Sequence, residues 1–70
     1  MKFARLKDQD QNPVGVDPAR VSSVYTYTPW GELDPHIDCK AVVCMLGGTA
    51  YWVCESANKA MDDIEEASAP

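Results

Sequence analysis

Three cysteines and one histidine are the residues of this chain whose types could do chemistry. Cys44 and Cys54 stand at the two ends of the mostly apolar stretch CMLGGTAYWVC, and Cys39 follows His36 at the spacing His-x-x-Cys. Such residues can form a disulfide, hold a zinc ion or make a cysteine nucleophile that a histidine activates. Which of these the chain can use depends on the elements that position the thiols.

The two glycines at the centre of that stretch, Gly47-Gly48, predict a β-hairpin, because glycine tolerates the positive φ angles of tight hairpin turns. A two-residue loop would place Cys44 opposite Tyr51 and Val42 opposite Val53. Since side chains alternate between the faces of a strand, Cys44 and Cys54 would then point to opposite faces. We therefore expect that they neither pair nor share a metal ion, unless the register differs.

Cys39 and His36 lack the rest of a site. A structural zinc ion needs four ligands, often in Cys-x-x-Cys pairs, and the chain has no such pair. A Cys–His nucleophile also needs an oxyanion hole and a third group, for which Asp34 and Asp38 are the candidates. We expect no catalytic residue, no metal and no cofactor, and interpret the thiols as packing residues. A small zinc or redox domain is the alternative.

Size and charge favour a binding protein over an enzyme. A chain of 70 residues makes one small domain and buries only ~60 % of its unfolded surface, which leaves little room for an enclosed cleft. The net charge of −5, from 11 acidic and 6 basic residues, speaks against duplex DNA as a direct partner. An acidic surface suits a basic protein surface instead.

The chain has no sequence signal for membrane insertion or export. No apolar run approaches the ~20 residues of a membrane helix. The start MKFARLKDQ has no apolar region of the kind found in signal peptides. We expect a cytoplasmic protein with free thiols.

The residue pattern predicts an α+β fold, with a small curved antiparallel sheet of four to five strands and one C-terminal helix. Asp17-Pro18 predicts a single helical turn, and the change of period after Ser56 predicts the helix. The expected strands are 2–6, 14–16, 21–28, 40–46 and 49–54. The apolar stripe of the helix is Ala57, Ala60, Met61, Ile64 and Ala67. Residues 1–70 are expected to form one domain, with a frayed tail at 68–70.

The segment PWGELDPHID, residues 29–38, predicts an exposed loop, since it has two prolines, a glycine and three acids. Trp30 is its candidate anchor, because tryptophan is a preferred hot spot of protein interfaces. The alternative is that Trp30 folds back as a lid over the core. The expected partner-binding residues are Trp30, Glu32, Asp34 and Asp38 of the loop, with Lys2, Arg5 and Lys7 of the basic N-terminal strand.

The hairpin is apolar on both faces, and a single helix covers only one of them. Curvature of the sheet, a second subunit or a partner must cover the other face, because monomers avoid large apolar patches. The sequence leaves the oligomeric state open.

The segments VDPARVSSV and AVVCMLGGTAYWVCES, followed by a short acidic helix, resemble the FlbD-like small proteins of flagellar and swarming motility and their phage-encoded relatives. The likeness lies in Asp17-Pro18, Val21, Val24, Gly47-Gly48, Val53, Glu55-Ser56 and Ile64. It covers most of the chain and implies a strand-rich fold without catalytic residues. The long loop 29–38 and the cysteines depart from that family.

Length, acidity and the added loop are also similar to small phage transcription regulators, including inhibitors of host RNA polymerase from Xanthomonas phages. This resemblance implies binding to the large subunits of bacterial RNA polymerase and interference with sigma-dependent initiation. The FlbD-like resemblance implies the alternative function, a motility-related adaptor. Both resemblances describe a regulator rather than an enzyme.

Overall fold

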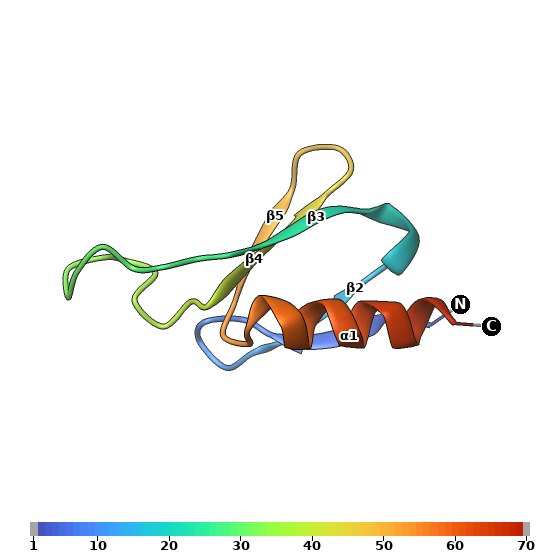
Figure 1. Cartoon of the computed structure of the whole chain (residues 1–70), viewed down its shortest axis with the longest axis horizontal. Helices are drawn as coiled ribbons and strands as arrows, with labels where there is room; N and C mark the ends of the chain where they lie inside the picture. The colour runs from blue at the N-terminus through green and yellow to red at the C-terminus, as the bar shows by residue number, and fades with distance from the viewer. Residues whose placement is uncertain (1, 70) are drawn as a thin grey trace.

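The computed structural model describes residues 2–69 and confirms the predicted α+β fold. Five strands form two antiparallel sheets, and a helix follows them at the C-terminus (Figure 1). The elements are β1 (Ala4–Lys7), β2 (Pro13–Val16), the short 3-10 turn η1 (Pro18–Arg20), β3 (Val21–Thr26), β4 (Ala41–Met45), β5 (Ala50–Val53) and α1 (Ala57–Ser68). The strands are therefore the expected ones, with bounds that differ by a few residues: β3, β4 and β5 are shorter than predicted, β2 is one residue longer, and β1 is shifted toward Lys7.

The two sheets meet along β1 and β5. One sheet is β1-β2 and the other has the order β3-β4-β5. Asp8, just after β1, bridges Val53, and the Cys54 amide donates to the Lys7 carbonyl at 3.0 Å. These contacts continue the strand surface from one sheet into the other. The result is an open, curved arrangement with its hollow side toward the helix.

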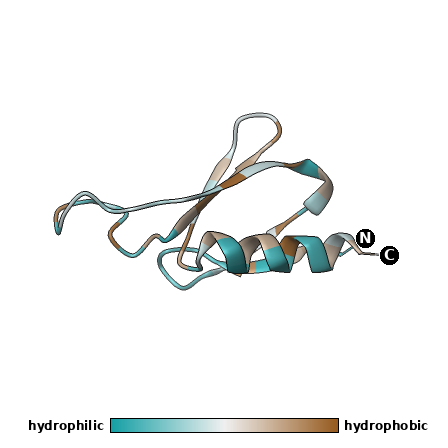
Figure 2. Cartoon of the chain, viewed as in Figure 1, coloured by the Kyte–Doolittle hydropathy of each residue, from teal (hydrophilic) through white to brown (hydrophobic). Residues whose placement is uncertain are grey.

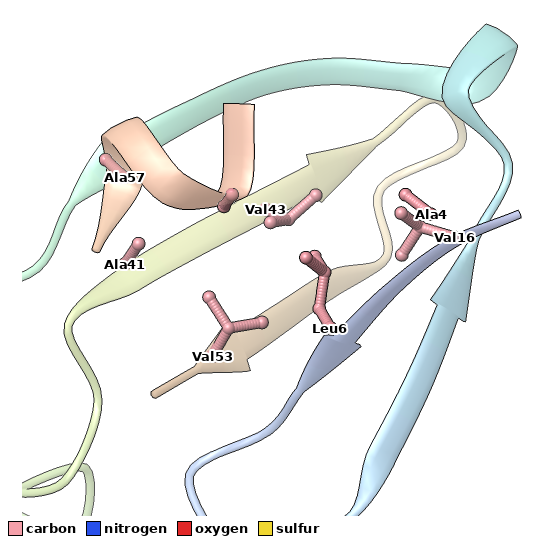
Figure 3. Packing of buried hydrophobic residues seen from close by; sticks show 8 residues of the cluster. Ala4, Leu6, Val16, Ala41, Val43, Val53 and Ala57 are labelled. Carbon is pink, nitrogen blue, oxygen red and sulfur yellow. The ribbon is translucent and has the colours of Figure 1, made fainter. Parts of the chain in front are cut away.

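The core lies on that hollow side, between the strands and α1 (Figure 3). It is built mainly from alanine and valine side chains, which pack closely between the strands and the helix. Its buried members are Ala4, Leu6, Val16, Ala41, Val43, Val53, Ala57 and Ala60. All three parts of the fold, both sheets and the helix, therefore share one cluster.

Capping residues begin both helical segments as expected. The Asp17 carboxylate accepts from the Ala19 amide at 3.0 Å, and the Ser56 hydroxyl accepts from the Lys59 amide at 3.2 Å. Met61 does not join the buried stripe of α1, since it is 38 % exposed.

The helix extends one residue into the predicted tail at 68–70. The helix runs through Ser68, and Ala69 caps its end by donating to the Glu66 carbonyl. Pro70 lies outside the described residues. The helix is too short to cross a membrane, and the described part of the chain contains no other helix that could.

The predicted hairpin register was wrong by one residue. The loop has three residues, 46–48, because the Met45 amide donates to the Thr49 carbonyl and Gly48 donates to the Met45 carbonyl. Both glycines have positive φ angles, 98° and 95°. Val42 therefore pairs with Trp52, and Cys44 with Ala50. Ala41, Val43 and Val53 face the core, whereas Cys44 lies on the outer face with Trp52.

In this register the alternation of side chains no longer places Cys44 and Cys54 on opposite faces of the hairpin. Distance separates them instead, because the partner of Cys44 is Ala50, four residues before Cys54. Four residues of strand span roughly 13 Å, far more than the Cα separation in a disulfide. All three cysteines are free thiols.

Candidate functional site: a projecting loop

The connection between β3 and β4 projects from one end of the molecule (Figure 1). It makes the chain elongated, with extents of 41 × 22 × 19 Å. The Tyr27 amide donates to the Lys40 carbonyl at 2.9 Å, so the two strands stay paired one step beyond β3 before the loop opens. The predicted loop 29–38 lies within this connection, and a backbone hydrogen bond between Tyr27 and Lys40 holds the two ends of the connection together.

A buried carboxylate organises the loop from within. Asp34 is only 3 % exposed, and its side chain accepts hydrogen bonds from the Tyr27 hydroxyl at 2.5 Å, the His36 amide at 2.9 Å and the Trp30 amide at 3.2 Å. Burial raises the pKa of this carboxyl, but the three hydrogen bonds outweigh it and hold the pKa below its ordinary value. Asp34 therefore stays ionised and fixes the path of the chain.

The Tyr27 phenol is held in its protonated form by the same contact. Its hydrogen bond to Asp34, together with burial and the negative charge of Asp34, raises the pKa of Tyr27 to about 12. The pair is thus a neutral donor on an ionised acceptor, which is the strong, charge-assisted kind of hydrogen bond.

Three rings attach the loop to the sheet. The His36 ring stacks on Trp52 of β5, with centroids 3.8 Å apart and planes within 2°. The Tyr27 ring lies nearly perpendicular to both, with its centroid 5.0 Å from that of Trp52 and 6.1 Å from that of His36. The His36 Nδ1 also lies 3.2 Å from the Gln9 Oε1, in the turn after β1. Loop, sheet and N-terminal turn are therefore joined at one point.

The loop presents three apolar side chains to solvent. Trp30 is 70 % exposed, Leu33 85 % and Ile37 46 %. Figure 2 shows hydrophobic segments in this projecting loop among hydrophilic neighbours. Trp30 therefore does not cover the core, and the lid alternative is wrong. We call these three residues the loop tip.

The acidic residues of the loop divide into two kinds. Glu32 and Asp38 are exposed, as a partner-binding role requires. Asp34, predicted as a third binding residue, is buried and engaged within the loop. It is therefore a positioning residue of the loop, and its carboxylate does not reach a partner.

The basic N-terminal residues lie on β1 and just before it. Lys2, Arg5 and Lys7 are exposed, since β1 alternates between buried and exposed positions. Lys2 and Arg5 line a shallow hollow beside α1, together with acidic side chains of that helix. The N-terminus and the loop are at opposite ends of the molecule (Figure 1). Lys2 and Arg5 therefore lie apart from the loop, whereas Lys7 is two residues before Gln9, whose side chain contacts His36 of the loop.

Leu33 and Ile37 were missed by the sequence reasoning. The available signal was the presence of large apolar residues between acids and prolines, where a solvated loop has no need of them. Trp52 and His36 were not recognised as a scaffold for the loop, because they are 16 residues apart in the sequence.

The Cys39 thiol is buried and hydrogen-bonded within the chain. Cys39 is 1 % exposed and its Sγ donates to the Ala41 carbonyl at 3.0 Å. Burial raises the pKa of the Cys39 thiol, which disfavours the thiolate that a nucleophile or ligand needs. In residues 2–69, no three side chains of His, Cys, Asp or Glu lie together as a metal site requires.

Comparisons with known proteins found no match: no family model fits the chain, and neither a curated protein nor a solved structure is significantly similar to it. The function must therefore be argued from the loop itself.

Proposed function

We propose that this protein is a regulator without enzymatic activity that binds a larger protein through the loop tip. The exposure of Trp30, Leu33 and Ile37 on a loop fixed by Asp34 carries this proposal. Large apolar side chains in solvent are unfavourable unless they are buried in a complex. A loop that is already ordered loses little conformational entropy on binding, so more of the contact energy appears as affinity.

The charge of the loop supports a basic partner surface. Glu32 and Asp38 are exposed beside the loop tip, and the whole chain carries a net charge of −5. Acidic groups around an apolar centre match interfaces in which an anchor is surrounded by a polar rim. Charges of this kind act mainly on the rate of association and on the choice of partner.

The narrower proposal is that the partner is bacterial RNA polymerase, bound at its large subunits, and that binding inhibits transcription initiation. Its support is the similarity of length, acidity and added loop to small phage regulators of host polymerase. On this proposal the protein is phage-encoded and acts in the host cytoplasm.

Purified bacterial RNA polymerase provides the direct test. We expect the wild-type chain to bind the polymerase and to reduce promoter-dependent transcription. Trp30→Ala should weaken binding by more than ~1 kcal/mol and leave the fold intact, because the side chain is largely in solvent. Leu46→Ala is the matched control, since Leu46 is an exposed apolar residue (55 %) on a different loop.

Two results would contradict parts of the proposal. Equal binding by the Trp30→Ala and Leu46→Ala variants would exclude the loop tip as the contact surface. No binding to polymerase, even at low salt where charge attraction is least screened, would exclude the narrower proposal. Flagellar genes beside the coding gene would then favour the motility-related adaptor.

A further inference from the structure

Glu55 has a buried carboxyl oxygen without a hydrogen-bond donor. Its Oε2 is shielded from solvent and has no hydrogen-bond partner within residues 2–69. The residue lies between the end of β5 and Ser56, the cap of α1. Its neighbour Cys54 donates its amide to the Lys7 carbonyl of β1, so two strands and the helix meet here. A carboxylate oxygen that lacks both water and a donor is unfavourable, so ionisation of Glu55 opposes folding.

A second carboxylate faces the same group. Asp63 lies in the second turn of α1, and its side chain is within hydrogen-bonding reach of the Glu55 carboxyl. Asp63 also accepts from the Lys59 Nζ at 2.7 and 2.8 Å. The three residues follow one another at intervals of four, the spacing that places side chains on one side of a helix. One ammonium group therefore lies beside two carboxyl groups and can neutralise only one of them.

The charged groups around Glu55 favour its protonated form. Burial raises the pKa of the Glu55 carboxyl, and the negative charge of Asp63 and the hydrogen bond between the two side chains raise it further. Lys59 of α1 and Lys7 of β1 act in the opposite direction but are outweighed. The buried oxygen and the neighbouring carboxylate therefore point to the same protonation state.

We propose that Glu55 is a proton switch at the start of α1. In mild acid, the Glu55 Oε2 takes up a proton from water and donates it in a hydrogen bond to the Asp63 carboxylate. A bond between an acid and a carboxylate is of the strong, charge-assisted kind. It gives the buried oxygen a partner and connects the segment after β5 to the second turn of the helix. At higher pH the proton returns to water and two carboxylates remain.

This switch makes the chain more stable in mild acid than at neutral pH. Because the pKa of Glu55 is raised in the folded chain, the contribution is complete below the ordinary glutamate pKa of about 4.3 and is lost as the pH rises through the folded pKa. The dependence is opposite in sign to that of Asp34, whose pKa is lowered. No ligand or partner protein is involved, so the switch is independent of the proposed binding function.

Carbon-13 NMR of the Glu55 carboxyl, followed in the full chain from about pH 3 to about pH 8, observes the proton directly. We expect a midpoint above the ordinary glutamate value. Asp63→Asn should lower this midpoint, because it removes a like charge beside the carboxyl. Asp62→Asn is the matched control, since it makes the same change at the preceding, exposed residue of α1 and should leave the midpoint nearly in place. A wild-type midpoint at or below the ordinary value would overturn the proposal, as would equal shifts in the two variants.

Glu55→Gln is the second test, because its amide has the shape of the protonated carboxyl and can donate a hydrogen bond at every pH. Urea denaturation at about pH 5 and about pH 8 should show a higher midpoint than the wild type at the higher pH and a smaller change between the two. Histidine also gains a proton in this range, so the measured quantity is the difference between wild type and variant. Glu65→Gln removes one charge at an exposed position of α1 and should keep the wild-type pH dependence. Equal pH dependence of the wild type and Glu55→Gln would contradict the switch. Neither experiment involves the loop tip.

Discussion

At the scale of single residues, the contact between Asp34 and Tyr27 holds the loop in one conformation. The carboxylate of Asp34 receives one side-chain and two backbone hydrogen bonds inside the loop. The Asp34-Pro35 pair and the hydrogen bond to the His36 amide are local turn features, but burial of Asp34 also depends on contact with Tyr27, seven residues earlier. Its burial could therefore not be predicted from composition and spacing, although the position of the loop could.

Asp34→Asn should loosen the loop and change the response of the protein to acid. The pKa of Asp34 is lowered in the folded chain, so its contribution to stability is present above the unfolded pKa and is lost as the pH falls through the folded pKa. Thermal unfolding followed from neutral pH to below about pH 4 should show this loss in the wild type and a smaller one in the variant. Asp38→Asn, which changes an exposed acid of the same loop, should behave like the wild type.

The raised pKa of Tyr27 predicts a loss of stability at high pH. Its pKa is raised to about 12, so its contribution to stability is complete below the unfolded value near 10 and is lost as the pH rises toward 12. The tyrosinate absorbance should show a late ionisation step that Tyr27→Phe removes and Asp34→Asn moves to lower pH. A late step that persists unchanged in the Tyr27→Phe variant would contradict the assignment.

At the scale of elements, local signals were sufficient wherever a cap or turn is made within a few residues. Asp17 and Ser56 were predicted as caps and both accept the expected amide. The hairpin was predicted from Gly47-Gly48, but its register was not. Two glycines with positive φ fit a two-residue loop and a three-residue loop equally well. The choice is made by the packing of Ala41, Val43 and Val53 against the helix, which is not local.

The cap of α1 gives the prediction for this scale. Ser56→Ala removes the acceptor of the Lys59 amide and should reduce the free energy of unfolding by about 1 kcal/mol. Lys59→Ala removes the 2.7 Å ion pair with Asp63 but keeps the capped amide. Because the pair is exposed, its loss should matter less than loss of the cap. Urea denaturation of both variants gives the comparison, and a larger loss in Lys59→Ala would contradict this ranking.

At the scale of the whole molecule, one cluster of small side chains joins both sheets to the helix. The sequence indicated the helix stripe and the alternating strands, so the members of this cluster were largely predictable. The outer face of the hairpin was harder to predict. Figure 1 shows that no helix lies on it, and Val42 is nonetheless only 1 % exposed. Its strand neighbours include Tyr25 and Trp52, whose large side chains share that face.

Leu6→Ala should come close to unfolding the entire chain. Leu6 is 1 % exposed, and truncating a buried leucine costs about 2–5 kcal/mol. A domain of this size has a core that supplies only about 3–5 kcal/mol of net stability, so one substitution removes most of it. Because the cluster connects every element, tryptophan fluorescence and far-ultraviolet circular dichroism should lose signal in the same urea transition, shifted to lower urea. Leu46→Ala makes the same chemical change at an exposed site and should leave the midpoint nearly unchanged. Separate transitions for the two probes would show that the sheets and the helix do not unfold as one unit.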